Sequence, residues 1–285
     1  MLHGMLPEKL IYYSLGVFDG DGQNFRNLDN DFDVIGRGWV APFALGGPEG
    51  LRAITIGGSG WSGRRESPLT QSLAAQTTQA GFSFFSPKWS GTPAMTGAAA
   101  PAYELRLDGR LDEWAFELNA PIAHRFGARF EWVHKSIPLS TVNTQGTPAV
   151  VAGSGSTLTG WSAYGEVWAW VVGDDRIIGE PGLQLPPRFK TFGTKPPADG
   201  VMLAARLDYL NEHIDADPGA VDLMNPLLGH TKLTALTLGV NYWHSKRFRA
   251  TANYVFNKLG GDTAAFKKLT STTEHELLFR LAVAL

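Results

Sequence analysis

Cysteine, charge and long apolar runs are all scarce in this chain. None of the 285 residues is a cysteine, which excludes disulfides, thiolate metal sites and thiol nucleophiles. Charged residues make up 18%, against roughly 25% in an ordinary soluble domain, and the net charge of −2 argues against a nucleic-acid partner held by bulk charge. No stretch approaches the roughly 18 consecutive apolar residues of a membrane helix, so a helical membrane protein is excluded. A membrane β-barrel stays open, because its strands are apolar on one side only.

The N-terminus also lacks a recognisable export signal. Residues 1–10 do not combine a charged start, an apolar core and a small-residue cleavage site. This leaves a cytoplasmic protein, a mature chain or a piece of a longer chain, and the strand pattern described next favours the last two.

Apolar residues alternate with polar residues almost everywhere, which predicts β-strands. The pattern is clearest at the C-terminal end, where Leu277, Phe279, Leu281, Val283 and Leu285 alternate with a set that contains Arg280. The stretch 159–172 is ambiguous, because an inward Glu166 would also place Trp168 and Trp170 inside. The same alternation of apolar and polar residues predicts further strands within 11–17, 113–119, 126–135, 201–209, 236–243 and 248–257.

The connections between these strands alternate in length, which is the arrangement of a transmembrane antiparallel β-barrel. Short turns fall at 7–9, 46–50, 120–125 and 244–246. The strands are about 10–12 residues long, whereas strands of soluble sandwiches usually have 5–6. A soluble β-sandwich is the alternative, since it has the same period. Long loops are expected on the extracellular side at 19–31, 61–108, 138–158, 211–230 and 258–273.

The strand count predicts that the barrel is partial. About eleven strands are expected if 1–6 forms one of them, whereas bacterial single-chain barrels have even numbers. The stretch 79–108 is then an excursion at the loop end, with 79–86 and 103–107 pairing outside the membrane. We expect that several N-terminal strands and the signal peptide are missing from this chain, because an unclosed barrel leaves unpaired edges in lipid.

Several short motifs, spread over the whole chain, resemble the phosphate-selective porin O and P family. They keep the order of that family and align with its later strands, roughly the sixth to the sixteenth. One departure is the terminal Leu285, where such barrels usually end in Phe. The motifs are MLHG at 1–4, YSLGVFDG at 13–20, DFDVIGR at 31–37, GWSAY at 160–164, and the hairpin LTLGVNYW at 236–243 with ANYV at 252–255.

The resemblance implies a sixteen-stranded trimeric porin of the bacterial outer membrane. Its function would be the passive diffusion of small hydrophilic solutes, favouring anions such as phosphate, through a charged, water-filled lumen. The implied partners are these solutes, outer-membrane lipid and two further copies of the chain, with no nucleic acid, cofactor or enzymatic activity. The arginine ladder on which phosphate selectivity rests in the family cannot be placed residue by residue in this sequence.

A pore works through the charges that line its lumen rather than through a catalytic group. Two interpretations remain open: a balanced mixture of paired charges, or an anion-selective stripe in which Arg37, Arg129, Arg206 and Arg249 face one constriction. Arg64 and Arg65 are expected in a loop at the mouth. Strand parity directs a larger set of charges inward, of which we select Arg37, Arg129, Lys135, Arg206, Arg249, Arg280, Glu117, Glu131 and Asp208 as pore-lining candidates; the others are Asp33, Arg106, Glu113, Glu166, Arg247 and Glu276.

Other motifs in the chain fail on their context. Gly58, Gly60 and Gly63 match a dinucleotide fingerprint, but no helix pattern follows them. The stretch 19–31 begins like a calcium loop and lacks the required glycine and glutamate of an EF-hand, which leaves weak binding of calcium or bridging to lipopolysaccharide by Asp19, Asp21, Asp29 and Asp31 as an alternative. The histidines show no metal spacing.

An outer-membrane barrel enzyme would need a serine or aspartate with a histidine at the outer rim, and the only rim histidine, His134, has a parity that points to lipid. A carbohydrate-binding sandwich and a structural barrel without conductance are further alternatives.

Overall fold

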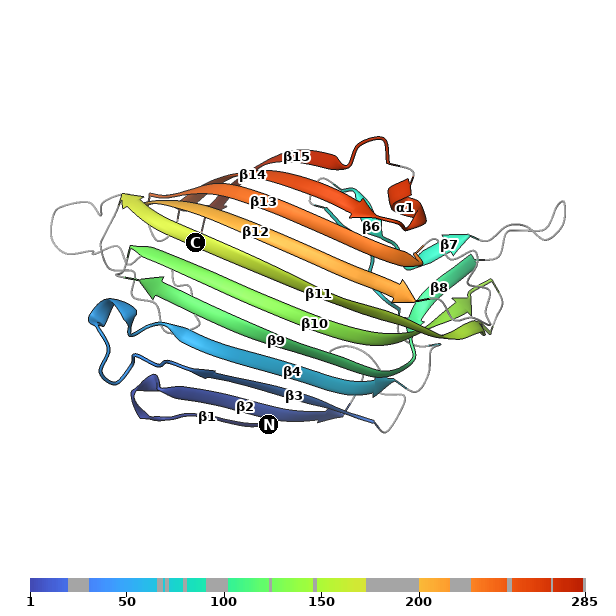
Figure 1. The fold of residues 1–285 in the computed structure, drawn as a ribbon, viewed down its shortest axis with the longest axis horizontal. Coiled ribbons are helices and arrows are strands. Elements are labelled where there is room, and N and C mark those ends of the chain that lie inside the picture. Colours follow the sequence, from blue (N-terminus) through green and yellow to red (C-terminus); the bar gives the residue numbers. More distant parts are fainter. Residues whose placement is uncertain are drawn as a thin grey trace.

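The computed structural model describes residues 1–19, 31–65, 69, 72–78, 81–90, 102–122, 125–145, 148–172, 200–215, 227–244, 248–267 and 269–283 (Figure 1). The chain is all-β, as the alternating pattern predicts, and its strands form one large antiparallel sheet of 13 strands. Eleven of them follow one another along the sheet in chain order, which agrees with the expected number. They are β1 (Leu2–Met5), β2 (Ile11–Asp19), β3 (Phe32–Val40), β4 (Thr55–Arg65), β9 (Gly109–Ile122), β10 (Phe126–Asn143), β11 (Val150–Val172), β12 (Gly200–Asp215), β13 (Gly229–Trp243), β14 (Phe248–Gly261) and β15 (Thr273–Val283).

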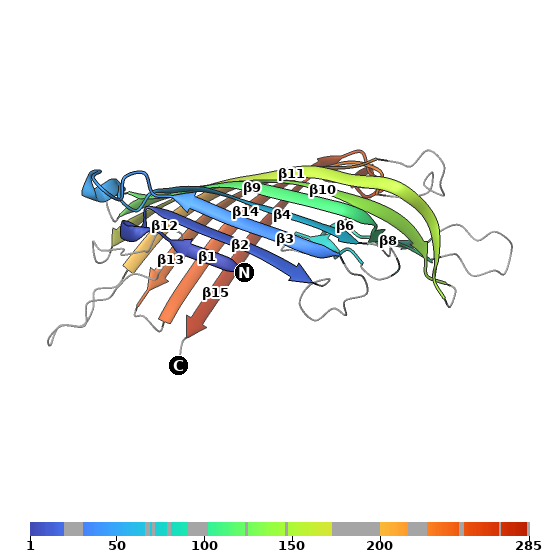
Figure 2. The same ribbon diagram turned by 90° about the horizontal axis from the view of Figure 1, so that it is seen from below.

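The sheet is strongly curved but does not close into a barrel. Figure 2 shows it as an open trough, with β1 and β15 at the two edges. Among the described residues each of these strands pairs with one neighbour only, β1 with β2 and β15 with β14. Closure requires hydrogen bonds between the two edges, so the described strands do not form a closed barrel; the sequence predicts only part of one in this chain.

The connections between the strands lie at the two ends of the trough. The 3₁₀ turns η1 (Pro7–Lys9) and η2 (Glu49–Leu51) lie between β1 and β2 and between β3 and β4, at the same end as the β9–β10 and β13–β14 connections (Figure 1). We call this the short-turn end and the opposite one the loop end. The β3–β4 connection, 41–54, is longer than the turn expected at 46–50.

Several stretches that were expected to be loops are strand instead. β10 and β11 stay paired as far as Asn143 and Val150, so most of 138–158 belongs to the ladder, and β4 continues to Arg65. β12 and β14 likewise extend into 211–230 and 258–273. The Ser- and Thr-rich composition favours loops, but Ser140, Thr141 and Ser156 are buried here beside neighbouring strands. The expected loop at 19–31 lies largely outside the described residues.

The segment between β4 and β9 forms its own small elements. β5 (Gln76–Thr77) pairs with β6 (Ser83–Phe85), whereas β7 (Lys88–Ser90) pairs with β8 (Ala102–Leu107). β8 also pairs with the loop end of β10, at Leu139–Asn143. The excursion expected at 79–108 is therefore present, and 103–107 pairs with strands of the main sheet.

The main apolar core lies on the concave side of the loop end. Phe84 and Phe85 pack there against strand residues that include Leu139, Leu158 and Ile214. Phe266, from the short helix α1 (Ala264–Lys267), completes the cluster, with its ring centroid 6.4 Å from that of Phe82. The segment around β6 thus covers the concave surface of β10–β14 at this end.

The described part of the chain holds no helix with the length and apolar character needed to span a membrane.

Candidate functional site: the charged concave face

Strand register places the nine predicted lumen residues on one face of the sheet. Arg129 pairs with Glu166, which in turn pairs with Arg206, and these three side chains therefore share a face. Glu117 pairs with Glu131, and Arg37 lies on the same face two strands away. This is the concave face that the apolar cluster covers at the loop end. Lys135, Asp208, Arg249 and Arg280 have the same parity on β10, β12, β14 and β15.

Arg37 and Glu117 form a two-pronged ion pair across the intervening strand β4. Arg37 Nε donates to Glu117 Oε1 at 3.0 Å and Nη2 donates to Oε2 at 2.7 Å, which is the strong fork geometry of arginine and carboxylate. Gly57 lies between them, and a Cβ at this position would be 2.8 Å from Glu117 Oε1. The missing side chain is what allows the pair to cross the strand.

Arg206 is the centre of a second group of polar contacts. Its guanidinium donates to Asp208 at 2.6–3.0 Å and lies 3.9 Å from Glu166 Oε2. The same guanidinium stacks over the Tyr164 ring, 3.8 Å from its centroid. Two carboxylates therefore share one arginine, and this group is slightly acidic rather than basic.

Lys135 pairs with Glu212, a residue that the sequence analysis did not select. Glu212 is 3% exposed, and the ammonium of Lys135 reaches it over Gly160. Glu212 shares the parity of Arg206 and Asp208, so alternation would have identified it if the strand had been extended past residue 210. The sequence predicts a loop over 211–230, whereas β12 continues to Asp215 and thereby includes Glu212.

Three candidate arginines have no ion pair with any residue that the structure describes. Arg129 lies 6.0 Å from the centroid of Trp168, and Arg249 lies 4.9 Å from that of Trp243. Arg280 is exposed and has no polar partner in the described ranges. Of the four residues of the expected anion stripe, Arg37 and Arg206 are thus ion-paired, whereas Arg129 and Arg249 are not.

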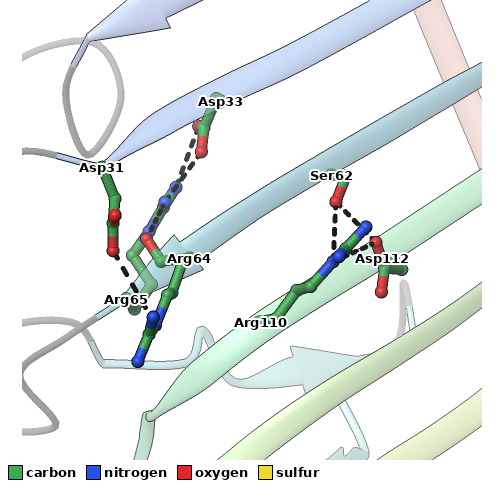
Figure 3. A network of polar contacts seen from close by, with 7 residues as sticks. All are labelled: Asp31, Asp33, Ser62, Arg64, Arg65, Arg110 and Asp112. Atoms are coloured by element: carbon green, nitrogen blue, oxygen red, sulfur yellow. Dashed lines mark hydrogen bonds and ion pairs between the residues drawn. The ribbon is translucent and has the colours of Figure 1, made fainter.

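Arg64 and Arg65 belong to β4 rather than to a loop, and they point to opposite faces. Arg65 is 5% exposed and forms a two-pronged pair with Asp33 at 2.8 and 3.0 Å, whereas Arg64 lies 3.8 Å from Asp31 (Figure 3). A Cβ on Gly63 would lie 1.9 Å from Asp33 Oδ1, so only glycine leaves room for this buried pair.

A polar group lies at the loop end of the convex face. Ser62 donates to Asp112 at 2.6 Å, and Arg110 Nε contacts both residues at 3.2 Å (Figure 3). These side chains have the parity of Trp114 and lie just beyond it along the strand. They form a polar rim next to an aromatic row.

The remaining motifs show no catalytic or metal-binding geometry within the described ranges. His134 has its Nδ1 without a hydrogen-bond partner, and its ring lies beside those of Trp114 and Trp132 on the convex face, as its parity predicts. No group of three or more His, Cys, Asp or Glu residues there could hold a metal ion. Gly58, Gly60 and Gly63 lie within β4, and the described residues between β4 and β5 form no helix.

Comparison with protein-family models and with curated proteins gives no match for this chain. The resemblance to the porin O and P family therefore remains a prediction from the motifs.

Proposed function

We propose that the chain forms part of an outer-membrane porin that passes small hydrophilic solutes by passive diffusion and favours anions. The observation that carries this proposal is the contrast between the two faces of one long-stranded sheet. Large apolar side chains are exposed along the convex face, among them Leu207, Val167 and Phe116 at 53%, 56% and 44%. The concave face carries arginines and carboxylates over the same strands. Lipid outside and water inside is the environment that this contrast fits.

The convex face is also graded along the strands, as a membrane-facing surface would be. Going along β9 from Ile122, the convex positions are apolar as far as Phe116, then Trp114 follows, and Asp112 and Arg110 come last. Trp132, Trp161 and Tyr209 continue the aromatic row on the next strands. The stretch from Ile122 to Phe116 spans about 20 Å along the strand at roughly 3.3 Å per residue, and about 26 Å with Trp114 included, which is comparable to the apolar band of such barrels.

The proposal requires that β1 and β15 gain strand partners in the bilayer. Unpaired N–H and C=O groups cost several kcal/mol each in hydrocarbon, so an open trough is not stable there. Further strands of the same polypeptide would close the barrel, as the sixteen-stranded family arrangement implies. A trimeric assembly, an outer-membrane location and phosphate as the solute are part of the same proposal.

Planar-bilayer conductance of the detergent-refolded full-length protein, with any strands that close the barrel, tests the proposal. We expect stepwise conductance under a KCl gradient, with a reversal potential that favours anions. Block of the steps by low phosphate concentrations would indicate a phosphate-selective channel, and steps without block would indicate a general porin. A protein that remains soluble without detergent and gives no steps would overturn the membrane function and favour a soluble binding module.

Arg129 provides a test of the lumen assignment. Its guanidinium has no carboxylate partner in the described ranges, so Arg129→Glu reverses a charge that is not already neutralised. We expect the reversal potential to shift toward cation selectivity. Arg110→Glu, on the convex face, is the control and should leave the reversal potential within error of the parent. Equal shifts in both variants would mean that the faces are assigned wrongly.

A further inference from the structure

The convex face of β12–β15 differs between its two ends. At the short-turn end its side chains are apolar, and they include Val201, Val240 and Leu281. At the loop end, the convex positions of β13 and β14 carry Lys232 and Lys258, and both lysines are exposed. The loop end of this face is therefore suited to an anionic partner that the short-turn end does not meet.

The two lysines are diagonal neighbours across the β13–β14 ladder. Lys232 pairs with Gly260, and two residues further on Thr234 pairs with Lys258. Diagonal residues of this kind have Cα atoms about 7–8 Å apart. Gly260 leaves the surface beside Lys232 open, because the nearest atom to a Cβ at this position would be Lys232 Cβ, at 4.0 Å. Both ammonium groups and the Thr234 hydroxyl can therefore reach one phosphate group placed over these four residues.

The lysines lie directly beyond the apolar part of their strands. On β14 the convex positions from Phe256 back to Phe248 are apolar or aromatic, and they span about 26 Å at roughly 3.3 Å per residue. This length matches the apolar band of a membrane barrel, about 25 Å. Tyr209, a member of the aromatic row, pairs with Thr234 and so lies beside Lys258. Aromatic side chains in such a row mark the level of the lipid headgroups, which is where the lysines are found.

Hydrogen-bond donors gather around Lys232. The rings of His213 and His230 stack with their centroids 4.1 Å apart, and His230 precedes Lys232 by two residues on the same face. Two acids at this end have donors of their own: Asp215 Oδ1 lies 2.6 Å from His213 Nε2, and Asp262 accepts a hydrogen bond from the backbone N–H of His230 at 2.5 Å. Imidazole N–H groups and ammonium groups are the kind of donors that phosphate oxygens accept from.

We propose that Lys232, Lys258 and Thr234 form a docking surface for the phosphorylated headgroup of a lipid in the leaflet at the loop end. Lysine stems can lie along apolar surface while their ammonium groups stay at the polar boundary. A lipid fits this surface better than a free anion, because the same strands expose Leu236 and Leu238 to cover its acyl chains. The inference rests on the proposed function for the membrane-facing role of the convex face, and it adds a lipid partner.

Native mass spectrometry of the full-length protein, refolded in an uncharged detergent, tests this surface. We would titrate lipid A, a glycolipid with two phosphate groups, and compare it with phosphatidylcholine, which has no net charge. We expect lipid A to bind more tightly than phosphatidylcholine. Each of Lys232→Gln and Lys258→Gln should weaken lipid A binding about fivefold, the scale of one lysine beside anionic lipid. Lys258→Arg should bind as the parent does, since it keeps the charge.

Arg280→Gln is the control. It removes one positive charge from an exposed position of the concave face, so we expect less than a twofold change in lipid A binding. Both lysines are exposed, so their glutamine variants should fold like the parent, and the electrophoretic shift between heated and unheated samples verifies this. Lysine variants that bind lipid A as tightly as the parent, or an equal loss in Arg280→Gln, would overturn the proposal.

The same spectra distinguish other occupants of the surface. Displacement of lipid A by equimolar inorganic phosphate would assign the lysines to a free anion, and loss of oligomers in place of bound lipid would assign them to a second copy of the chain. Either result overturns the proposal. Lysine-dependent binding of lipid A by a protein that gives no conductance would support the surface and overturn the porin. Conductance with lipid binding unchanged by either lysine variant would do the reverse.

Discussion

Glycine decides which charged side chains can meet on the concave face. The pairs Arg37–Glu117 and Lys135–Glu212 each cross a strand whose intervening residue is glycine, at Gly57 and Gly160. Without a Cβ below it, a long side chain lies flat against the sheet and reaches the strand beyond. The charged groups therefore lie along the wall instead of projecting from it, which would keep a lumen open.

The pair Gly160 and Gly165 on β11 allows a matched test of this role. A Cβ at Gly160 would meet Glu212 Cγ at 2.8 Å and Asn211 O at 2.9 Å, whereas nothing lies within 4 Å of one at Gly165. We expect Gly160→Ala to lower the free energy of unfolding by about 1–3 kcal/mol, the usual cost of overpacking. Gly165→Ala should leave it unchanged or raise it. Urea titration of the refolded chain measures both, and equal effects would contradict the idea.

Glu104 on β8 gives the loop end a dependence on pH. Its burial acts to raise the pKa, but hydrogen bonds from Arg106, Ser72 and Lys88 outweigh burial, and the pKa of this carboxyl is lowered overall. A group with a lowered pKa stabilises the fold fully above its unfolded pKa, about 4.3 for Glu, and the stabilisation is lost as pH falls through the folded value.

We therefore expect β8 to loosen in acid. Backbone hydrogen exchange over residues 102–107, corrected for its intrinsic pH dependence, should lose protection as the pH falls below about 4. Glu104→Gln should show weaker protection at pH 7 and little further loss in acid. A parent protein whose β8 protection is flat down to pH 3 would contradict the role given to Glu104.

At the scale of elements, the segment between β4 and β9 changes what the strands alone would form. Phe84 and Phe85 bring it onto the concave surface, where it meets Leu139, Leu158 and Ile214. β10 is longer than a membrane crossing needs because its last residues pair with β8 as well as with β11. In the proposed pore, this segment would narrow the mouth at the loop end.

Phe85→Ala tests how the segment is held. Truncating a buried phenylalanine costs about 3–5 kcal/mol, and Phe85 is one of the two buried phenylalanines that pack this segment against the sheet, so the segment should detach. We expect faster proteolysis within 72–90, unchanged unfolding of the main sheet and, in the proposed pore, a larger single-channel conductance. Leu69→Ala, at an exposed position of the same segment, is the control and should change none of these. Global unfolding of Phe85→Ala would show that the segment and the sheet form one cooperative unit.

Over the whole molecule, the two faces of the sheet differ in polarity and therefore suit different surroundings. The convex face exposes large apolar groups, whereas most described charges of the concave face lie in ion pairs or against aromatic rings, with Arg280 as an exception. Residues 115 and 116 occupy these two faces at adjacent positions of β9. They make the difference measurable with one type of substitution.

We expect Phe116→Lys to impair folding into phospholipid bilayers by about 2–4 kcal/mol, the cost of lysine at the lipid face near the midplane. Ala115→Lys, one residue away on the concave face, should fold nearly as well as the parent. The electrophoretic shift between heated and unheated samples reports the folded fraction. Equal tolerance of both lysines would contradict the membrane-facing assignment of the convex face.

Strand positions and faces were predictable, and ion-pair partners were not. Alternation places Arg37, Arg129 and Arg206 on one face without knowledge of the register, because side chains alternate strictly along each strand. The stretch 159–172 is ambiguous from the sequence, and the cross-strand register decides it by placing Glu166, Trp168 and Trp170 on the concave face. The predicted loop boundaries were wrong. Ser- and Thr-rich composition indicates a turn only where no neighbouring strand supplies backbone hydrogen bonds to the segment.

The all-β class, the path of about eleven antiparallel strands and the faces of the strand charges follow from a local period of two in the sequence. That Arg37 meets Glu117, that Glu212 joins Lys135, and that Arg249 and Arg280 meet no acid in the described ranges follows only from the folded chain. Those outcomes depend on cross-strand register and on glycines beneath the side chains. Both bring together residues that are far apart in the chain, which local patterns cannot encode.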